Sequence, residues 1–302
     1  MVEIPETSLS VGFALLQLAE AQREDSRRLH LGASEIGDEC LRRIWYSFRW
    51  VSDGARDGRA LRILRRGKAE EQQMLQDLRD LGWEVLRGED FRVSLASGHF
   101  GGTPDGVVRG VPAAPAKWHI LELKTANDAN WKKLAKLGVK EAQPAHYAQM
   151  QVYMLGREID RALYLSINKN DDTVYEERVE LNRIEATRLV ERATRAIDRH
   201  TLPERISDDP DWFQCRMCRH HATCFEPKFP LRTCRTCLHV ETFTPAGWRC
   251  TKHDRVLDEA DQKTGCGDHR YLPSLLHWLQ QMDATDSVVI YDTWVDKGQH
   301  EP

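Results

Sequence analysis

The sequence predicts an α+β fold of the α/β-sandwich kind, in which helices flank a central mixed β-sheet. Apolar residues recur at helical spacing in three long stretches, and short strand-like segments lie between them. The helical stretches span 61–81, 142–155 and 183–200; the strand-like segments span 83–86, 91–95, 106–109, 118–124, 162–168 and 173–181. From residue 203 onwards Cys, His, Pro and Arg replace this periodicity, which predicts a loop-rich, metal-held C-terminal region.

Two helices are expected before the sheet. The first covers 8–28 and carries apolar residues such as Phe13 and Leu18 at helical spacing. The second opens at Ser34, a residue suited to an N-cap, and runs to Phe48. The first four strands follow one another closely, so we expect them to form a meander.

Charge and hydropathy narrow the class of protein. The 302 residues carry a net charge of -4, which argues against a protein that coats nucleic acid non-specifically. No apolar run approaches the roughly 20 residues that cross a bilayer, and the N-terminus lacks the basic-then-apolar order of a signal peptide. We therefore expect a protein of the cytoplasm (the host cytoplasm if it is phage-encoded), with reduced thiols and no membrane partner.

Two basic patches are the candidate DNA contacts. The first contains Arg56, Arg59, Arg62, Arg65, Arg66 and Lys68; the second contains Trp131, Lys132, Lys133 and Lys136. Of these we expect Arg62, Arg66, Lys132 and Lys133 to touch nucleic acid. A solvated helix face is the alternative for either patch.

The most informative motif pairs Asp105 with Glu122 and Lys124. Strand side chains alternate between faces, so Glu122 and Lys124 point the same way while Leu121 and Leu123 point into the core. Asp105 can meet them from the neighbouring strand. Two carboxylates on one face repel unless a divalent cation lies between them, and Mg²⁺ or Mn²⁺ prefers such oxygen ligands. A phosphodiester is the natural substrate for this pair.

Pro104-Asp105 followed by Glu122-Leu123-Lys124 resembles the motif of the PD-(D/E)xK nuclease superfamily. The resemblance implies that Asp105, Glu122 and the Leu123 carbonyl hold one or two Mg²⁺ or Mn²⁺ ions. Such ions lower the pKa of a bound water and neutralise charge on the scissile phosphate. Lys124 would orient the same water or phosphate oxygen as a pre-organised positive charge.

Two further elements resemble the RecB-like and phage exonuclease branches of that superfamily. Gly67 to Glu71 resembles a Gly-x-x-x-His/Glu element, here without the more common His, and would add Glu71 to the metal ligands. The choice of Glu71 over Glu70 depends on its spacing from Gly67.

Gln149 and Tyr153 match the Gln-x-x-x-Tyr element of the same branches, on one helix face that His146 shares. They would bind the phosphate backbone or hold Lys124 in place, and His146 would contact nucleic acid. An ordinary amphipathic helix packing on the sheet is the alternative.

The eight cysteines divide into two groups, and cytoplasmic disulfides are the weaker explanation for them. The first group is Cys40, Cys215, Cys218 and Cys224. It resembles the cysteine pattern of the iron-sulfur nucleases of the AddB and CRISPR-associated exonuclease families, in which four such thiolates hold a 4Fe-4S cluster. That cluster would close a loop of about 175 residues as a clasp around the core. Zinc on the same thiolates is the alternative, as is a Cys40 that is simply packed.

The second group is Cys234, Cys237, Cys250 and Cys266. A Cys-x-x-Cys pair with two later cysteines is typical of a small zinc site, and we expect four-thiolate ligation. His239, His253 and His269 lie near and any of them can replace a cysteine. His220 and His221, inside the first group, are expected at the surface.

These observations predict an N-terminal helical segment (1–30), a nuclease domain with an iron-sulfur clasp (31–228) and a zinc-binding extension (229–302). The implied function is a Mg²⁺- or Mn²⁺-dependent DNA exonuclease that processes phage or mobile-element DNA, with a single-strand annealing or recombination protein as a possible partner. One rival is a structure-dependent or restriction-type endonuclease with the same site. The other is a catalytically idle DNA-binding partner protein.

Overall fold

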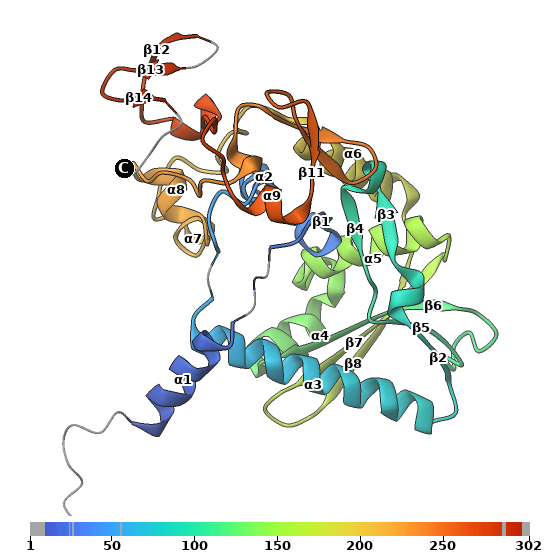
Figure 1. Cartoon of the computed structure of the whole chain (residues 1–302). Helices are drawn as coiled ribbons and strands as arrows, with labels where there is room; N and C mark the ends of the chain where they lie inside the picture. Colours follow the sequence, from blue (N-terminus) through green and yellow to red (C-terminus); the bar gives the residue numbers. More distant parts are fainter. Residues whose placement is uncertain (1–9, 24, 26, 55, 286–287, 298–302) are drawn as a thin grey trace, which may run out of the picture.

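The computed structural model describes residues 10–23, 25, 27–54, 56–285 and 288–297 (Figure 1). A five-stranded mixed sheet in the order β2-β5-β6-β7-β8 forms its centre, which confirms the predicted α+β class. The strands are β2 (Glu84–Arg87), β5 (Gly106–Arg109), β6 (His119–Ala126), β7 (Arg161–Asn168) and β8 (Val174–Glu180). All neighbouring pairs are antiparallel except β6 and β7, which are parallel.

The parallel pair requires a crossover, because parallel strands cannot be joined by a tight turn. Two helices make it, α4 (Asp128–Ala142) and α5 (Pro144–Arg157). The sequence predicted α5 but not α4, which is broken at Gly138, a residue with φ of 75°. The crossover sets the register that places Glu122 opposite Tyr164 in β7.

Helices cover both faces of this sheet. The last turns of α3 (Gly58–Asp80) pack Met74 and Leu78 against Leu121 and Leu163 on one face. Helix α5 packs on the opposite face, with α6 (Arg183–Asp198) behind it. Asp57 caps α3 by accepting a hydrogen bond from the Ala60 N–H at 2.7 Å.

The N-terminal helices are shorter than expected. The first is α1 (Val11–Ala21), and residues 8, 9, 24 and 26 of its predicted span lie outside the described residues. Ser34 does not cap a helix: it lies in a 3₁₀ turn, η1 (Ala33–Glu35), and α2 (Leu41–Phe48) begins only after Cys40.

The predicted four-strand meander is wrong in one strand. β3 (Val93–Leu95), between the 3₁₀ turns η2 (Gly88–Phe91) and η3 (Ala96–Gly98), leaves the central sheet and pairs with β4 (Phe100–Gly102). β4 also pairs in parallel with β1 (Leu31–Gly32). β5 therefore lies directly between β2 and β6, so the residues at the start of β5 lie next to β6.

The C-terminal region is more ordered than its composition predicts. Its elements are α7 (Phe213–Arg216), α8 (His221–Phe225), η4 (Cys234–Thr236), β9 (Val240–Phe243), β10 (Gly247–Cys250), β11 (Arg255–Leu257), α9 (Glu259–Lys263), η5 (Pro273–Leu276), β12 (Gln281–Ala284), β13 (Val289–Tyr291) and β14 (Val295–Asp296). Trp248 of β10 is fully buried, with its ring 5.1 Å from that of Phe48 in α2. The expectation that this region carries no core element is wrong, because β9 to β11 share the main core.

The apolar residues of the last thirty positions predict a helix around Leu276 and Trp278 and a strand at 288–291. The strand is present as β13, within the small antiparallel sheet β12 to β14, whereas Leu276 ends a 3₁₀ turn in place of the predicted helix. Within the described part of the chain, no helix is both long and apolar enough to span a membrane.

Candidate active site

Asp105, Glu122 and Lys124 meet at the junction of β5 and β6. Asp105 immediately precedes β5, and the antiparallel register pairs Gly106 with Leu121. The Asp105 carboxylate reaches across and accepts a hydrogen bond from the Leu123 N–H at 2.7 Å. A main-chain contact between neighbouring strands therefore holds the first carboxylate in place.

Lys124 is the cation of this group. Its Nζ contacts Glu122 Oε1, lies 3.5 Å from Asp105 Oδ2 and donates to the Leu123 carbonyl at 2.9 Å. Its side chain is 27 % exposed, so part of it reaches solvent. One positive charge is shared between two carboxylates.

Glu122 is the buried member. Its side chain is 0 % exposed, and neither carboxylate oxygen has a hydrogen-bond donor of good geometry among the described residues. Burial raises the pKa of Glu122 to about 8, against the opposing effect of Lys124. A buried carboxylate with unmet oxygens beside a second carboxylate fits a hard divalent cation, which supplies the missing positive charge.

Glu71 approaches from α3. It lines the same cavity as Asp105, whereas Glu70 is not among the residues that line it. Burial first and the Asp105 charge second raise the pKa of Glu71, while Lys124 and Lys68 lower it. Glu71, Asp105 and Glu122 therefore lie within electrostatic reach of one another, although among the described residues their oxygens do not all come within 4.8 Å of one another. Carboxylate oxygens are the ligand type that Mg²⁺ or Mn²⁺ prefers.

Gln149 and Tyr153 lie on α5, behind Glu122. Gln149 Nε2 donates to the Tyr153 hydroxyl at 3.3 Å, and both side chains are buried. Burial and then the Glu122 charge raise the pKa of Tyr153. A Cβ at Gly102 would come within 2.6 Å of the Tyr153 hydroxyl, so the ring is wedged under the segment that carries Asp105. This pair therefore lies beneath the segment that leads to Asp105.

His146 faces the same side of α5. Its Nδ1 lies 2.9 Å from the Tyr164 hydroxyl, and the two rings stack. Burial, followed by the Lys124 charge, lowers the pKa of His146 to about 4. The imidazole is therefore neutral at neutral pH. Tyr164 was missed by the sequence analysis, since an aromatic residue in a buried strand carries no signal of its own.

The predicted DNA-contacting cations are dispersed. Arg62 lines a groove with Lys68, whereas Arg66 is exposed and is not among the residues that line it. On α4, Lys132 pairs with Asp128 at 2.8 Å, and Lys133 is exposed on the same helix.

The first cysteine group lines one cavity, although Cys40 comes from the start of α2 and the others from residues 215–224. After burial, the charges of Cys40, Cys224 and Cys218 raise the pKa of Cys215, which places the four thiols near one another. Arg42 Nη1 donates to Cys224 Sγ at 3.7 Å, and the His220 N–H donates to Cys218 Sγ at 3.4 Å. Hydrogen bonds from cationic and main-chain donors to sulfur suit thiolates that hold a metal ion or an iron-sulfur cluster.

His220 is not at the surface as expected. It is 2 % exposed, and its ring contacts Ser52 Oγ at 2.7 Å and Ser47 Oγ at 3.2 Å. Burial lowers its pKa to about 3, so the ring is neutral and joins the cysteine segment to α2. His221 is partly buried, with its Nε2 3.2 Å from the Pro210 carbonyl oxygen.

The second cysteine group lines another cavity, together with His239, His253 and His269. In the described residues, one group of three or more ligand atoms lies within 4.8 Å of one another: His253, Cys266 and Asp268. His253 Nε2 is 3.7 Å from Cys266 Sγ and 3.3 Å from Asp268 Oδ2. His269 instead contacts Thr236 Oγ1 at 3.3 Å. Asp268 was missed by the sequence analysis.

Comparisons with known proteins give structural neighbours alone, since no family model and no curated protein matches the chain. An alkaline exonuclease, LHK-Exo from Laribacter hongkongensis, has 15 % identity, a TM-score of 0.39, and a match that covers 60 % of this chain and 90 % of that one. LHK-Exo in complex with dAMP has 14 % identity and a TM-score of 0.39, over 57 % and 88 % of the two chains. SSO0001 has 16 % identity and a TM-score of 0.41, over 68 % and 92 %.

Proposed function

We propose that this protein is a divalent-metal-dependent deoxyribonuclease that hydrolyses phosphodiester bonds at DNA ends. The observation that carries the proposal is the meeting of Asp105, the fully buried Glu122 and Lys124 at one sheet edge, where two carboxylates share one ammonium group. A buried carboxylate whose partner ammonium is shared with a second carboxylate is only partly compensated, and a divalent cation would complete it.

In this proposal Asp105, Glu122 and Glu71 hold Mg²⁺ or Mn²⁺, together with the Leu123 carbonyl. The bound ion supplies Lewis-acid activation of a water and of the scissile phosphate. Lys124, whose side chain is partly exposed, donates to a non-bridging phosphate oxygen and stabilises the negative charge that develops there. Gln149 and Tyr153 hold the position of Glu122.

We also assign the two cysteine groups to metals. Cys40, Cys215, Cys218 and Cys224 would hold a 4Fe-4S cluster, and Cys234, Cys237, Cys250 and Cys266 would hold zinc, with His253 and Asp268 beside Cys266. Anaerobically purified protein should then be brown, with about four irons and one zinc per chain. Colourless protein with two zincs would overturn the cluster assignment.

The activity is tested with linear and circular DNA and Mn²⁺. Wild-type protein should shorten a linear strand from its end and leave a closed single-stranded circle intact. Lys124→Ala should lower kcat by a factor of at least about 100, as expected for loss of a charge that acts on the transition state. Cutting of the circle would indicate an endonuclease, and wild-type protein that degrades no DNA would refute the proposal.

A further inference from the structure

A basic groove lies beside the site, at the N-terminal half of α3. Its volume is about 890 Å³, and its walls come from the end of α1, the segments before and after α2, and α3 itself (Figure 1). Six basic side chains and two acidic ones line it, an excess of four positive charges in a chain whose net charge is -4. The basic residues are Arg23, Arg27, Arg56, Arg62, Arg65 and Lys68.

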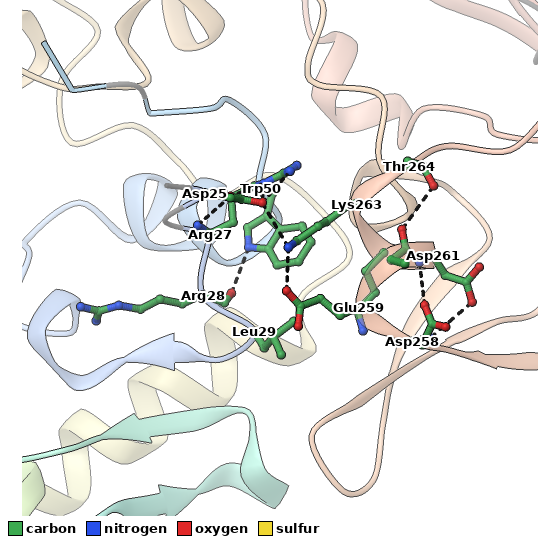
Figure 2. Close-up of polar contacts among 12 residues, drawn as sticks. Asp25, Arg27, Arg28, Leu29, Trp50, Asp258, Glu259, Asp261, Lys263 and Thr264 are labelled. Atoms are coloured by element: carbon green, nitrogen blue, oxygen red, sulfur yellow. Dashed lines mark hydrogen bonds and ion pairs between the residues drawn. The ribbon is translucent and has the colours of Figure 1, made fainter. Parts of the chain in front are cut away.

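One of the two acidic residues is already neutralised. Asp25 pairs with Arg27 at 2.9 Å and with Lys263 of α9 at 3.2 Å, as Figure 2 shows. The hydrogen bond from Arg27 is the main reason why the pKa of Asp25 is lowered. The surplus of positive charge therefore faces the open space of the groove.

The cations on α3 form a stripe that leads to the candidate active site. Arg62, Arg65, Lys68 and Glu71 follow one another at a spacing of three residues, and each such step turns about 60° around the helix, so the row winds around α3 and Lys68 is the cation beside Glu71. Lys68 is close enough to Glu71 to lower its pKa. Along the helix axis, Arg62 lies about 14 Å from Glu71. Lys68, which also lines the groove, therefore connects the groove with Glu71.

The lining suits a single strand rather than a duplex. Leu61, Leu64 and Leu231 alternate with the cations, and Leu64 is 49 % exposed. A duplex presents phosphates and sugars to such a surface, whereas a single strand also presents the apolar faces of its bases. A lining that combines cationic side chains with leucine side chains matches the phosphates and bases of a single strand.

The walls of the groove are held firmly. Helix α1 touches the start of α3 so closely that a Cβ at Gly58 would lie 2.2 Å from the Leu16 carbonyl oxygen, and Glu20 accepts the Gly58 N–H at 2.7 Å. On the other side, Lys263 bridges Asp25 and Glu259, and the Trp50 indole donates to the Arg28 carbonyl at 3.0 Å (Figure 2). A preformed groove of this kind loses little entropy when it binds a ligand.

We propose that this groove binds single-stranded DNA several nucleotides away from the scissile phosphate and directs the strand along the α3 stripe to the metal ligands. The inference rests on the proposed nuclease function for its substrate. The groove sets how much single strand a substrate must carry, because a shorter strand reaches the metal ligands without touching Arg62.

The test is fluorescence anisotropy of labelled oligo-dT in buffer without added Mg²⁺ or Mn²⁺, which measures binding without hydrolysis. Arg62→Glu/Arg65→Glu should weaken binding of an oligonucleotide of about 20 nucleotides at least tenfold and reduce its salt slope by about 0.7 for each phosphate that is no longer neutralised. Binding of an oligonucleotide of about 4 nucleotides should change less than threefold. Arg183→Glu/Arg188→Glu, an equal double charge reversal at exposed positions of α6, is the control and should leave both unchanged.

Equal affinity of the double variant and the wild type for the long strand would overturn the inference, as would a loss seen for blunt duplex but not for single strand. Because binding is measured without added Mg²⁺ or Mn²⁺, no hydrolysis occurs and the two proposals can fail separately. If wild-type protein cleaves no DNA but its binding depends on the stripe, the nuclease proposal falls and the groove assignment stands. If the wild-type protein cleaves DNA but the substitutions in the stripe leave binding unchanged, the groove assignment falls and the nuclease proposal stands.

Discussion

Glu122 is the residue whose environment most constrains the chemistry. It lies on a strand that is buried on both faces, and its nearest cation, Lys124, is shared with Asp105. Burial disfavours the charged carboxylate, so the metal-free protein retains a proton on Glu122 below its pKa of about 8. A divalent ion must displace that proton, which couples metal binding to pH.

We expect Mn²⁺ binding at pH 7 to release protons and the apparent affinity to rise with pH until about pH 8. The sign follows from the raised pKa: below it the metal competes with a proton, and above it the carboxylate is free. Calorimetry in two buffers with different ionisation enthalpies measures the release. Glu122→Gln should abolish it and weaken Mn²⁺ binding by more than about tenfold, whereas Glu70→Gln should change neither. Zero proton release by the wild type would contradict this account.

The segment before β5 positions Asp105 by packing closely against the turn η2. A Cβ at Gly88 would lie 1.8 Å from the Pro104 carbonyl oxygen, so η2 and the residues before β5 pack backbone against backbone. Only glycine permits this approach. The position of Asp105 thus depends on a turn that is more than ten residues earlier in the chain.

Gly88→Ala should destabilise the protein by about 1–3 kcal/mol, since the new methyl group must displace the Pro104 segment. It should also lower Mn²⁺ affinity, because Asp105 moves with that segment. Chemical denaturation and Mn²⁺ titration measure the two effects. Gly12→Ala is the matched control, since a Cβ there meets only Ser10 Oγ, at an ordinary contact distance of 3.9 Å. Equal effects of the two substitutions would show that the close approach is unimportant.

Arg235 ties the C-terminal elements to the rest of the fold. Its guanidinium is fully buried, donates to the Phe48 and Leu29 carbonyls at 2.8 Å each, and lies 3.7 Å from the centre of the Trp50 ring. It also donates twice to Gln262 Oε1. Because Arg235 stands between Cys234 and Cys237, the second cysteine group is joined to the segments on both sides of α2.

Arg235→Lys should cost about 2 kcal/mol or more of unfolding free energy, because an ammonium group cannot reproduce the planar fork of donors. Leu29 and Trp50 adjoin the groove wall, so oligo-dT binding should weaken as well. Denaturant unfolding gives the first quantity and anisotropy the second. Arg249→Lys, at a partly exposed arginine that pairs with Asp254, should change stability by no more than about 0.5 kcal/mol. If both variants are equally stable, Arg235 does not join these elements.

At the scale of the whole molecule, buried neutral histidines connect separate parts of the chain. His146 joins α5 to β7, and His220 joins the first cysteine group to α2. Burial lowers their pKa values to about 4 and about 3, respectively. The unfolded chain therefore binds more protons than the folded protein between about pH 6.5 and pH 4.

Stability should consequently fall as the pH drops from about 6.5 towards 4.5, by up to about 2–3 kcal/mol for each histidine. Unfolding free energy measured against pH gives this slope for the wild type. His146→Gln/His220→Gln should flatten the slope, although it lowers stability at pH 7. An unchanged slope in the double variant would mean that other groups set the acid sensitivity.

The sequence by itself determined that the strand after Asp105 adjoins the strand of Glu122, and that Asp105 meets Glu122 and Lys124 there. Strand alternation and the short connection between these neighbouring strands are local properties, so residue spacing is enough to predict them. The second cysteine set, and Cys215, Cys218 and Cys224 of the first, were predictable from spacing, whereas Cys40 joined the first set only through the resemblance to iron-sulfur nucleases; the thiols of each set line one cavity.

The tertiary structure alone decided which side chains are buried at long range. Trp248 and His220 pack against α2, and Arg235 inserts beneath Trp50, each from a segment whose composition indicated an exposed loop. The groove beside α3 likewise needs walls from separate segments. Burial and concavity of this kind arise from contacts between residues far apart in the chain, which periodicity and local composition do not encode.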